Sequence, residues 1–255
     1  MGRINVSILY IVIPAYNESE NVESVVKGWY PVIQRYSSNG NSRLVIIDDG
    51  SKDNTYEILQ KLSSNMPLLI PIKKENGGHG DTVLFGYRYA LNNGADYIFQ
   101  TDSDGQTNPA EFENFWQMRN EYEAIFGYRV KREDGKFRLW VEKILCLILK
   151  FQFKVSVPDA NAPFRLMKES YVRRYIDIMP EHYNLPNVIL TVMGAFYQDH
   201  VRFEEISFKP RQGGHNSINV KRIFKIGYQA LSDFAEIKKN AEKLEVERIR
   251  GCHIS

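Results

Sequence analysis

Two aspartates separated by one residue form the strongest local chemical signal in the sequence. Asp102-Ser103-Asp104 follows an apolar segment, and Gln106 comes two residues after Asp104. Two carboxylates this close repel one another unless a cation joins them. A hard divalent ion such as Mn²⁺ or Mg²⁺ prefers oxygen ligands, so we predict a metal site formed by Asp102, Asp104 and Gln106. The competing structural interpretation is an aspartate-rich turn that caps a helix near Pro109.

Two further polar motifs also follow apolar segments. Asp48-Asp49-Gly50-Ser51 has the composition of an Asx turn, but a carboxylate at a strand end can also accept from the imino N–H of uracil or guanine. Pro14-Ala15-Tyr16-Asn17-Glu18 offers an aromatic face for such a base through Tyr16. The competing structural interpretation of this motif is a strand-to-helix turn in which Asn17 caps the helix and Glu18 lies in the first turn.

Alternating strand and helix patterns must position these motifs. We expect buried strands at 6–13, 44–47, 68–72, 97–100 and 124–128. We expect helices after Asn17, after Asp53-Asn54-Thr55 and over 82–91. This order predicts an α/β fold with a mostly parallel twisted sheet and helices on both faces. Ligands of such sheets bind beyond the carboxyl ends of the strands, where all three motifs lie.

The alternation fades in the second half. A basic stretch from Arg129 precedes an apolar run from Leu139 to Val155, which Glu142 and three lysines interrupt. The run is therefore no membrane span, and it fits either a core helix or an interfacial helix lying on a bilayer. Residues 158–161 are typical of a loop, 201–208 of a strand, 209–217 of a glycine-rich basic loop, and a charged helix is expected from Val220.

Length and composition favour a single globular domain. The chain has 255 residues, with 33 Lys plus Arg against 31 Asp plus Glu. The resulting net charge of +2 gives no bulk field for binding nucleic acid. Cys146 and Cys252 form no disulfide framework, which favours a reducing compartment. The first residues lack the pattern of a signal peptide, so a cytoplasmic location is expected.

The motifs, taken in order, resemble those of the family-2 inverting glycosyltransferases. The matching segments are IVIPAYNE, IIDDGSKDNT, ENGGHGDTVLFGYRYAL and TDSDGQ, which together span about the first half of the chain. Within the family, the chain is most similar to the branch of dolichyl-phosphate mannose synthase and polyprenyl-phosphate glycosyltransferases. Gly127-Tyr128-Arg129, the segment from Asp159 to Arg165 and the segment from Arg211 to Ser217 fall where that branch has motifs of its own.

The resemblance implies a GT-A fold and sugar transfer with inversion from a UDP- or GDP-sugar to a lipid phosphate or a glycan. Such a role belongs to cell-surface polysaccharide or glycoconjugate synthesis. The metal ion would neutralise the diphosphate leaving group. A membrane surface and a second copy of the chain are compatible with the sequence as further partners. The protein would then bind peripherally to the cytoplasmic face of the membrane. The implied division is 1–128 for the nucleotide sugar, 129–219 for the acceptor, and 220–255 for a helix and tail.

The resemblance also assigns roles to residues. The nucleoside would be contacted by Pro14, Ala15, Tyr16, Glu18, Ile47 and Asp49. Diphosphate and metal would be contacted by Asp102, Ser103, Asp104 and Gln106. Arg129 and Arg211 would bind phosphate. Asp159 would act as general base toward a sugar hydroxyl, or else hold its loop or pair with Arg165.

The sequence departs from the family pattern only on the acceptor side. Ser217 lies one position late and lacks a following lysine, Tyr128 replaces Ser or Thr, and Ala162-Pro163 replaces Ser-Gly. The acceptor, the sugar and the choice between UDP and GDP are therefore left open. One alternative is a non-catalytic nucleotide-sugar-binding subunit of a glycan-synthesis complex. A nicotinamide enzyme is excluded, because P-A-Y-N-E stands where G-x-G-x-x-G is needed, and a P-loop enzyme lacks its motif.

Overall fold

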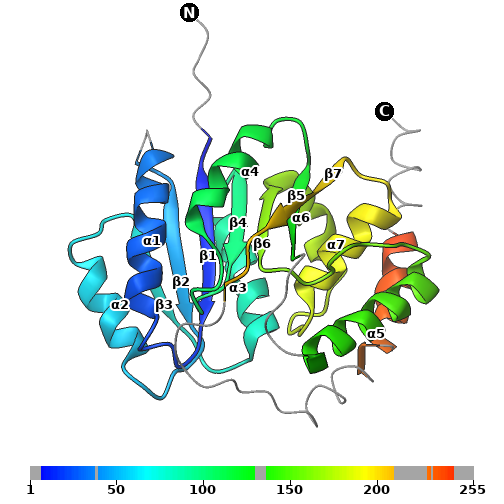
Figure 1. Ribbon diagram of the computed structural model, residues 1–255, viewed down its shortest axis with the longest axis horizontal. Helices are drawn as coiled ribbons and strands as arrows, with labels where there is room; N and C mark the ends of the chain where they lie inside the picture. The colour runs from blue at the N-terminus through cyan, green and yellow to red at the C-terminus, as the bar shows by residue number, and fades with distance from the viewer. Residues whose placement is uncertain (1–6, 38–39, 130–135, 210–228, 231, 244–255) are drawn as a thin grey trace, which may run out of the picture.

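A twisted sheet with helices on both faces forms the centre of the molecule (Figure 1). The computed structural model describes residues 7–37, 40–129, 136–209, 229–230 and 232–243, without the side chains of 136–142. The described residues form a seven-stranded sheet in the order β3-β2-β1-β4-β6-β5-β7. The strands are β1 (Leu9–Ala15), β2 (Arg43–Asp48), β3 (Leu69–Lys73), β4 (Tyr97–Thr101), β5 (Ala124–Arg129), β6 (Phe164–Lys168) and β7 (Val201–Ile206).

The pairing of these strands is parallel except at β6, which runs antiparallel to both of its neighbours, β4 and β5. The predicted α/β class with a mostly parallel sheet is therefore confirmed. The helices are α1 (Val22–Arg35), α2 (Thr55–Ser63), α3 (His79–Asn92), η1 (Pro109–Glu111), α4 (Phe112–Met118), α5 (Lys136–Phe153), α6 (Glu169–Ile176) and α7 (Pro186–Phe196). Residues 232–243 are also helical.

Side chains that alternate along β1 enter two separate cores. Leu9, Ile11 and Ile13 pack with α1, α2 and α4, whereas Tyr10 and Val12 pack with α3, α6 and α7. This is the pattern of a strand buried on both faces, and it explains the continuous apolar run in the sequence. The helix of residues 232–243 and the inner side of α5 complete the second core.

Close packing of α3 on the sheet depends on a glycine. A Cβ added at Gly86 would lie 2.3 Å from Val12 Cγ1 and 2.8 Å from Ile47 Cδ1. The helix axis can therefore approach β1 and β2 only because this position has no side chain. The approach fixes the beginning of α3, where His79 and Asp81 lie, against the carboxyl ends of these strands.

The first predicted helix cap is wrong. Helix α1 begins at Val22, and Asn17 has a left-handed backbone with φ of 53°. Its Oδ1 instead accepts from the Lys52 backbone N–H at 2.8 Å, and its own N–H donates to Ser51 Oγ at 2.9 Å. Asn17 thus joins the loops after β1 and β2, which tertiary contact decides over local capping preference.

One further boundary and one strand differ from the prediction. Helix α3 begins at His79, three residues before the expected start, so the glycine-rich loop ends at Gly78. Strand β6 was not predicted at all. It is short, and its Arg165 is fully buried, where the guanidinium donates to the carbonyl oxygens of Ala162 and Asn187 and to Thr191 Oγ1. The hydrophobic pattern did not predict this strand, because a charged residue interrupts its apolar positions.

Candidate active site

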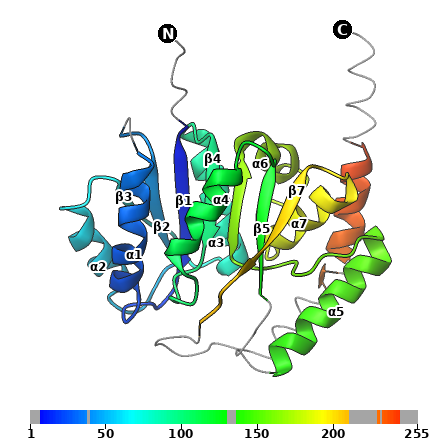
Figure 2. The ribbon, with the colours of Figure 1, turned by 45° about the horizontal axis from the view of Figure 1, so that its top comes forward.

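Strand direction brings the polar motifs to one edge of the sheet. In the pairing of β1 with β2, Pro14 lies opposite Ile47 and Ala15 opposite Asp48. Strand β5 ends at the same edge, and the antiparallel β6 begins there, with Phe164 opposite Thr101 of β4. The ends of β1, β2, β4 and β5 and the loop before β6 therefore lie at one edge, at the bottom of the view in Figure 2. This placement of the three predicted motifs follows the rule for parallel sheets.

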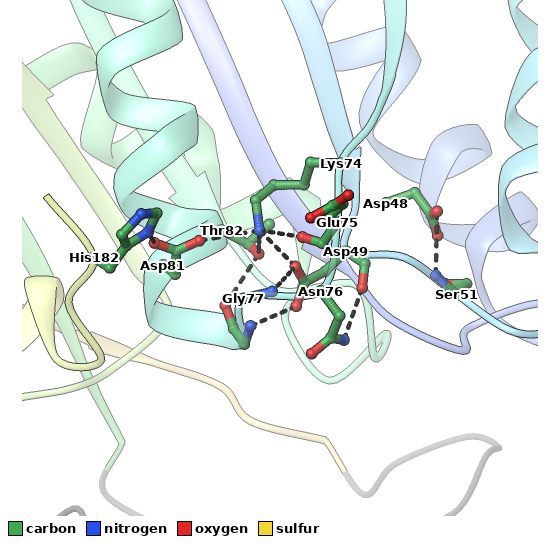
Figure 3. A network of polar contacts seen from close by, with 11 residues as sticks. Asp48, Asp49, Ser51, Lys74, Glu75, Asn76, Gly77, Asp81, Thr82 and His182 are labelled. Carbon is green, nitrogen blue, oxygen red and sulfur yellow. Dashed lines mark hydrogen bonds and ion pairs between the residues drawn. The ribbon is translucent and has the colours of Figure 1, made fainter.

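The Asp49 carboxylate organises the loop after β3. Its Oδ1 accepts from Lys74 Nζ at 2.7 Å and from the Gly77 N–H at 2.9 Å, and its Oδ2 accepts from the Gly78 N–H at 2.8 Å (Figure 3). Asp49 is only 3% exposed. The neighbouring Asp48 points the other way and accepts from the Ser51 N–H at 3.3 Å. Asp49 is thus the carboxylate that faces the glycine-rich loop.

Lys74 is the hub of a charged network that the sequence analysis missed. Its ammonium lies 2.7 Å from Asp49 Oδ1 and 3.0 Å from Asp81 Oδ2, and His182 Nδ1 lies 2.7 Å from Asp81 Oδ1 (Figure 3). Burial lowers the pKa of Lys74, but the two carboxylates outweigh this and raise the pKa above its ordinary value. The one feature of the sequence that points to Lys74 is its position, because it directly follows the third strand at the ligand-binding edge.

A chain of buried amides holds Asp102. Gln100 Nε2 donates to Asp102 Oδ1 at 3.0 Å, and Gln100 Oε1 accepts from Asn187 Nδ2 at 2.9 Å. Asn187 Oδ1 in turn accepts from the Tyr87 hydroxyl at 2.6 Å. Gln100 is fully buried and Asn187 nearly so, which makes each of these hydrogen bonds costly to lose. Gln100 and Asn187 are further site residues that the sequence analysis did not single out.

The other contacts of Asp102 favour its ionised form. His79 Nε2 lies 3.0 Å from Asp102 Oδ1. Burial raises the pKa of Asp102, but the charges of His79 and Arg129 and the bond from Gln100 outweigh it, so the pKa lies below its ordinary value.

The predicted metal ligands surround a tight turn after β4. Asp104 Oδ1 accepts from the Gln106 N–H at 3.1 Å, and Gln106 exchanges hydrogen bonds of 2.8 Å with Lys209 through its amide group and its carbonyl oxygen. Ser103 is buried. Neither aspartate caps the short helix η1, because Asn108 accepts from Ala110 there. The alternative interpretation, in which the Asp102–Asp104 motif caps the helix near Pro109, is therefore wrong.

The donor set fits a cation that a substrate helps to bind. Among the described residues, no three His, Cys, Asp or Glu side chains are close enough together to enclose a metal ion. Asp102 and Asp104 are half-buried and separated by one residue, so they offer hard oxygen atoms on an open side. Mg²⁺ is commonly held by one or two carboxylates together with substrate phosphates and water, and this site matches that pattern.

The predicted nucleoside contacts divide into exposed and buried groups. Tyr16 is 38% exposed, so its ring is available at the edge. Glu18 is buried, with its carboxylate accepting from Asn21 at 2.7 Å and its N–H donating to Thr55 Oγ1 at 2.9 Å. The Ile47 side chain is fully buried in the core under α3, which leaves its backbone as the part facing the edge. Pro14 and Ala15 are also buried.

Arg129 and Asp159 form a bidentate ion pair. The Arg129 Nε and one terminal nitrogen lie 2.7 and 3.1 Å from the two Asp159 oxygens. Their side chains are 7% and 4% exposed. Asp159 also accepts from the Asn161 N–H at 3.1 Å, which holds the predicted loop. The expectation that Asp159 pairs with Arg165 is wrong, because Arg165 bonds to backbone carbonyls and Thr191 instead. Arg211 lies outside the described residues.

A family model described as Glycosyl transferase family 2 matches residues 10–176. The chain belongs to this family. A family-2 match over this range covers β1 to α6, and so includes the edge where the motifs meet.

Similar proteins include transferases named for polyprenyl phosphates. The chain is 25% identical over 177 residues to an undecaprenyl-phosphate 4-deoxy-4-formamido-L-arabinose transferase of Pseudomonas savastanoi pv. phaseolicola, covering 68% of this chain and 50% of that protein. It is 32% identical over 139 residues to a UDP-N-acetylglucosamine–dolichyl-phosphate N-acetylglucosaminyltransferase of Methanococcus voltae, covering 49% and 53%. The chain therefore spans about half the length of these curated relatives.

Solved structures of similar fold include glucosyl-3-phosphoglycerate synthase from Mycobacterium tuberculosis in complex with Mn²⁺, UDP and glucosyl-3-phosphoglycerate. The TM-score is 0.66 at 15% identity, and the match covers 91% of this chain and 80% of that one. This similarity confirms the predicted GT-A fold for the family-2 chain. Among the described residues, no helix combines the length and the apolar character needed to cross a membrane.

Proposed function

We propose that this family-2 chain transfers a sugar, with inversion, from a UDP- or GDP-sugar to a polyprenyl phosphate, with Mn²⁺ or Mg²⁺. The observation that carries the proposal is the meeting of Asp49, the Asp102–Asp104 motif and Arg129 at one sheet edge. Asp49 can accept a hydrogen bond from a base, the Asp102–Asp104 motif can bind a metal-bound diphosphate, and Arg129 can bind a phosphate. The relatives named above act on undecaprenyl phosphate and dolichyl phosphate by their names, and a solved neighbour was crystallised with Mn²⁺ and UDP.

On the donor side, the base lies against Tyr16 and donates its imino N–H to Asp49. A carboxylate oxygen has two acceptor sites, and Oδ2 of Asp49 accepts from the Gly78 N–H at one of them. Lys74 and the loop amides hold this carboxylate ionised and in a fixed orientation. Glu18, Pro14, Ala15 and the Ile47 backbone form the wall of the nucleoside site.

Asp102 and Asp104, with Gln106, hold the divalent ion, which when bound neutralises the charge that develops on the diphosphate leaving group. Gln100 and Asn187 keep Asp102 in the orientation that the site requires. Ser103 is buried in the same turn and contributes its backbone to the diphosphate site.

On the acceptor side, a phosphate oxygen attacks the anomeric carbon from the face opposite the diphosphate, which inverts the configuration. A phosphate is already anionic, so it needs positioning and no general base. Arg129 and Arg211 supply the positive charge. Because Asp159 is bound in a bidentate pair by Arg129, we assign it the role of orienting that guanidinium and not that of a base. Residues 1–128 then bind the donor and residues 129–219 the acceptor.

The proposed acceptor resides in a bilayer, so we place the protein peripherally on the cytoplasmic face of a membrane. The test is a transfer assay with labelled UDP- and GDP-sugars, a short-chain polyprenyl phosphate and Mn²⁺ or Mg²⁺. We expect labelled lipid that is lost with EDTA and in Asp104→Asn, whose shape is nearly unchanged. Nucleotide-sugar turnover that is insensitive to both changes would contradict the metal assignment, and label on a sugar hydroxyl alone would contradict the acceptor.

A further inference from the structure

The protein itself occupies most of the hydrogen-bonding capacity of the Asp49 carboxylate. An ionised carboxylate offers about four acceptor positions, two on each oxygen. Oδ1 of Asp49 accepts from Lys74 Nζ at 2.7 Å and from the Gly77 N–H at 2.9 Å, and Oδ2 accepts from the Gly78 N–H at 2.8 Å. Within the described part of the chain, these donors occupy both positions on Oδ1 and one on Oδ2. One position, on Oδ2, therefore remains for a ligand.

The ammonium of Lys74 is held firmly against Asp49. It has three N–H donors, and three acceptors lie around it: Asp49 Oδ1, the Glu75 carbonyl oxygen at 2.9 Å and Asp81 Oδ2 at 3.0 Å (Figure 3). Turning Lys74 toward solvent would take the shared ammonium away from two carboxylates that are 4% and 11% exposed, which is costly. Because its donors are already used, Lys74 orients Asp49 and does not itself contact the base.

The glycine-rich loop is equally fixed. A Cβ added at Gly77 would lie 2.2 Å from Asp81 Oδ2 and 3.0 Å from Lys74 Nζ, so the backbone passes directly against the charged network. Asn76 Nδ2 also donates to the Asp49 carbonyl oxygen at 2.8 Å. The Gly77 N–H and the Lys74 ammonium therefore stay on Oδ1, and the acceptor positions of Asp49 are set before a ligand binds.

Nucleobases differ in the number of donors that they present to such a carboxylate. Uracil presents one, the imino N3–H between two carbonyl groups. Guanine presents two side by side, N1–H and the 2-amino group, which together require both oxygens of a carboxylate. Cytosine has no hydrogen on N3 and so faces the carboxylate with an acceptor. One remaining position satisfies uracil, whereas guanine would leave an amino N–H unpaired in the site.

We infer that Lys74 makes the nucleoside site selective for uridine diphosphate sugars over guanosine diphosphate sugars, by holding Oδ1 of Asp49 so that only Oδ2 can accept from the base. This inference rests on the proposed function, because it narrows the donor from two nucleotides to one. Lys74 acts as a positioning residue that determines specificity through Asp49.

Calorimetry with nucleoside diphosphates and Mn²⁺ tests the inference. We expect the wild type to bind UDP at least about tenfold more tightly than GDP. Inosine diphosphate keeps the ring size and the N1–H of guanine but lacks the 2-amino group, so it should bind at least about fivefold more tightly than GDP. Lys74→Met frees a position on Oδ1 and should lower the ratio of UDP to GDP affinity at least about threefold. The matched control is Lys73→Met, whose native ammonium lies over the Tyr56 ring, and it should leave the ratio unchanged.

Three results would overturn the inference. GDP bound as tightly as UDP would do so, as would inosine diphosphate bound no more tightly than GDP, since ring size would then explain the preference. An unchanged ratio in folded Lys74→Met would remove Lys74 as the determinant. The nucleotide comparison uses the wild type alone, so it decides the selectivity even where Lys74→Met does not fold. The proposed function is judged by CDP: CDP bound as tightly as UDP would contradict the base contact of Asp49, whereas weak CDP with equal UDP and GDP contradicts the inference alone.

Discussion

Replacing Asp159 with Asn separates its two expected roles, because orienting Arg129 and acting as a base predict different results. The change keeps the shape and removes the charge that balances a guanidinium only 7% exposed. Removing one partner of a buried ion pair costs about 3–5 kcal/mol of unfolding free energy. Asn still accepts one hydrogen bond from Arg129, so we expect the lower end, about 3 kcal/mol. For a chain of this length that lowers Tm by about 6–12 °C.

The assay combines thermal unfolding with transfer kinetics well below Tm. The double variant Arg129→Gln/Asp159→Asn should recover most of the lost stability, because neither member of this pair then carries a buried charge. Asp177→Asn, at an exposed position after α6, is the matched control and should stay within about 0.5 kcal/mol of the wild type. Asp159→Asn should raise the KM for the phosphate acceptor and change kcat little. An unchanged Tm with kcat lowered about 10²–10⁴-fold would refute this reasoning and make Asp159 the general base.

Three further substitutions test other parts of the site. Asp49→Ala should weaken binding of nucleoside and nucleoside diphosphate alike by about 1–3 kcal/mol in calorimetry, and equal affinities would move attention to Asp48. Gln100→Leu should destabilise the fold by about 1–3 kcal/mol, since Asn187 loses its acceptor, and should raise the Mn²⁺ concentration needed for half-maximal turnover; a purely structural role would leave that concentration unchanged. Gly80→Ala should cost about 1–3 kcal/mol, because its Cβ would lie 2.0 Å from the Asn184 carbonyl oxygen, whereas Gly28→Ala, with 3.4 Å to its nearest neighbour, should not destabilise.

The sequence was informative where local pattern and strand direction together decide position. Buried strands follow from continuous apolar runs, and the meeting of the motifs at one edge follows from parallel pairing. The strand ends at Asp48, Thr101 and Arg129 could be placed at one edge from that rule alone, without knowledge of contacts between distant residues. The family resemblance rested on the same residues, and the family match over 10–176 bears it out.

The remaining features depend on contacts between residues far apart in the chain. Gln100 and Asn187 are 87 residues apart, and Asp81 and His182 are 101 apart, so no local pattern joins them. Strand β6 was not predicted because it contains the buried Arg165, which donates to the carbonyl oxygen of Asn187 in helix α7. The cap expected at Asn17 was replaced by a bond to Lys52. In each case a tertiary hydrogen bond overrides what the neighbouring residues favour.

The central claim is that the Asp102–Asp104 edge binds a metal-bound nucleotide sugar whose sugar passes to a polyprenyl phosphate. The most direct measurement is the transfer of labelled sugar to a short-chain polyprenyl phosphate, with and without Mn²⁺, by the wild type and by Asp104→Asn. The account predicts labelled lipid phosphate from the wild type with metal and almost none in the other three reactions. Nucleotide sugar that binds but never labels the lipid, or that labels it equally in all four reactions, would contradict the account.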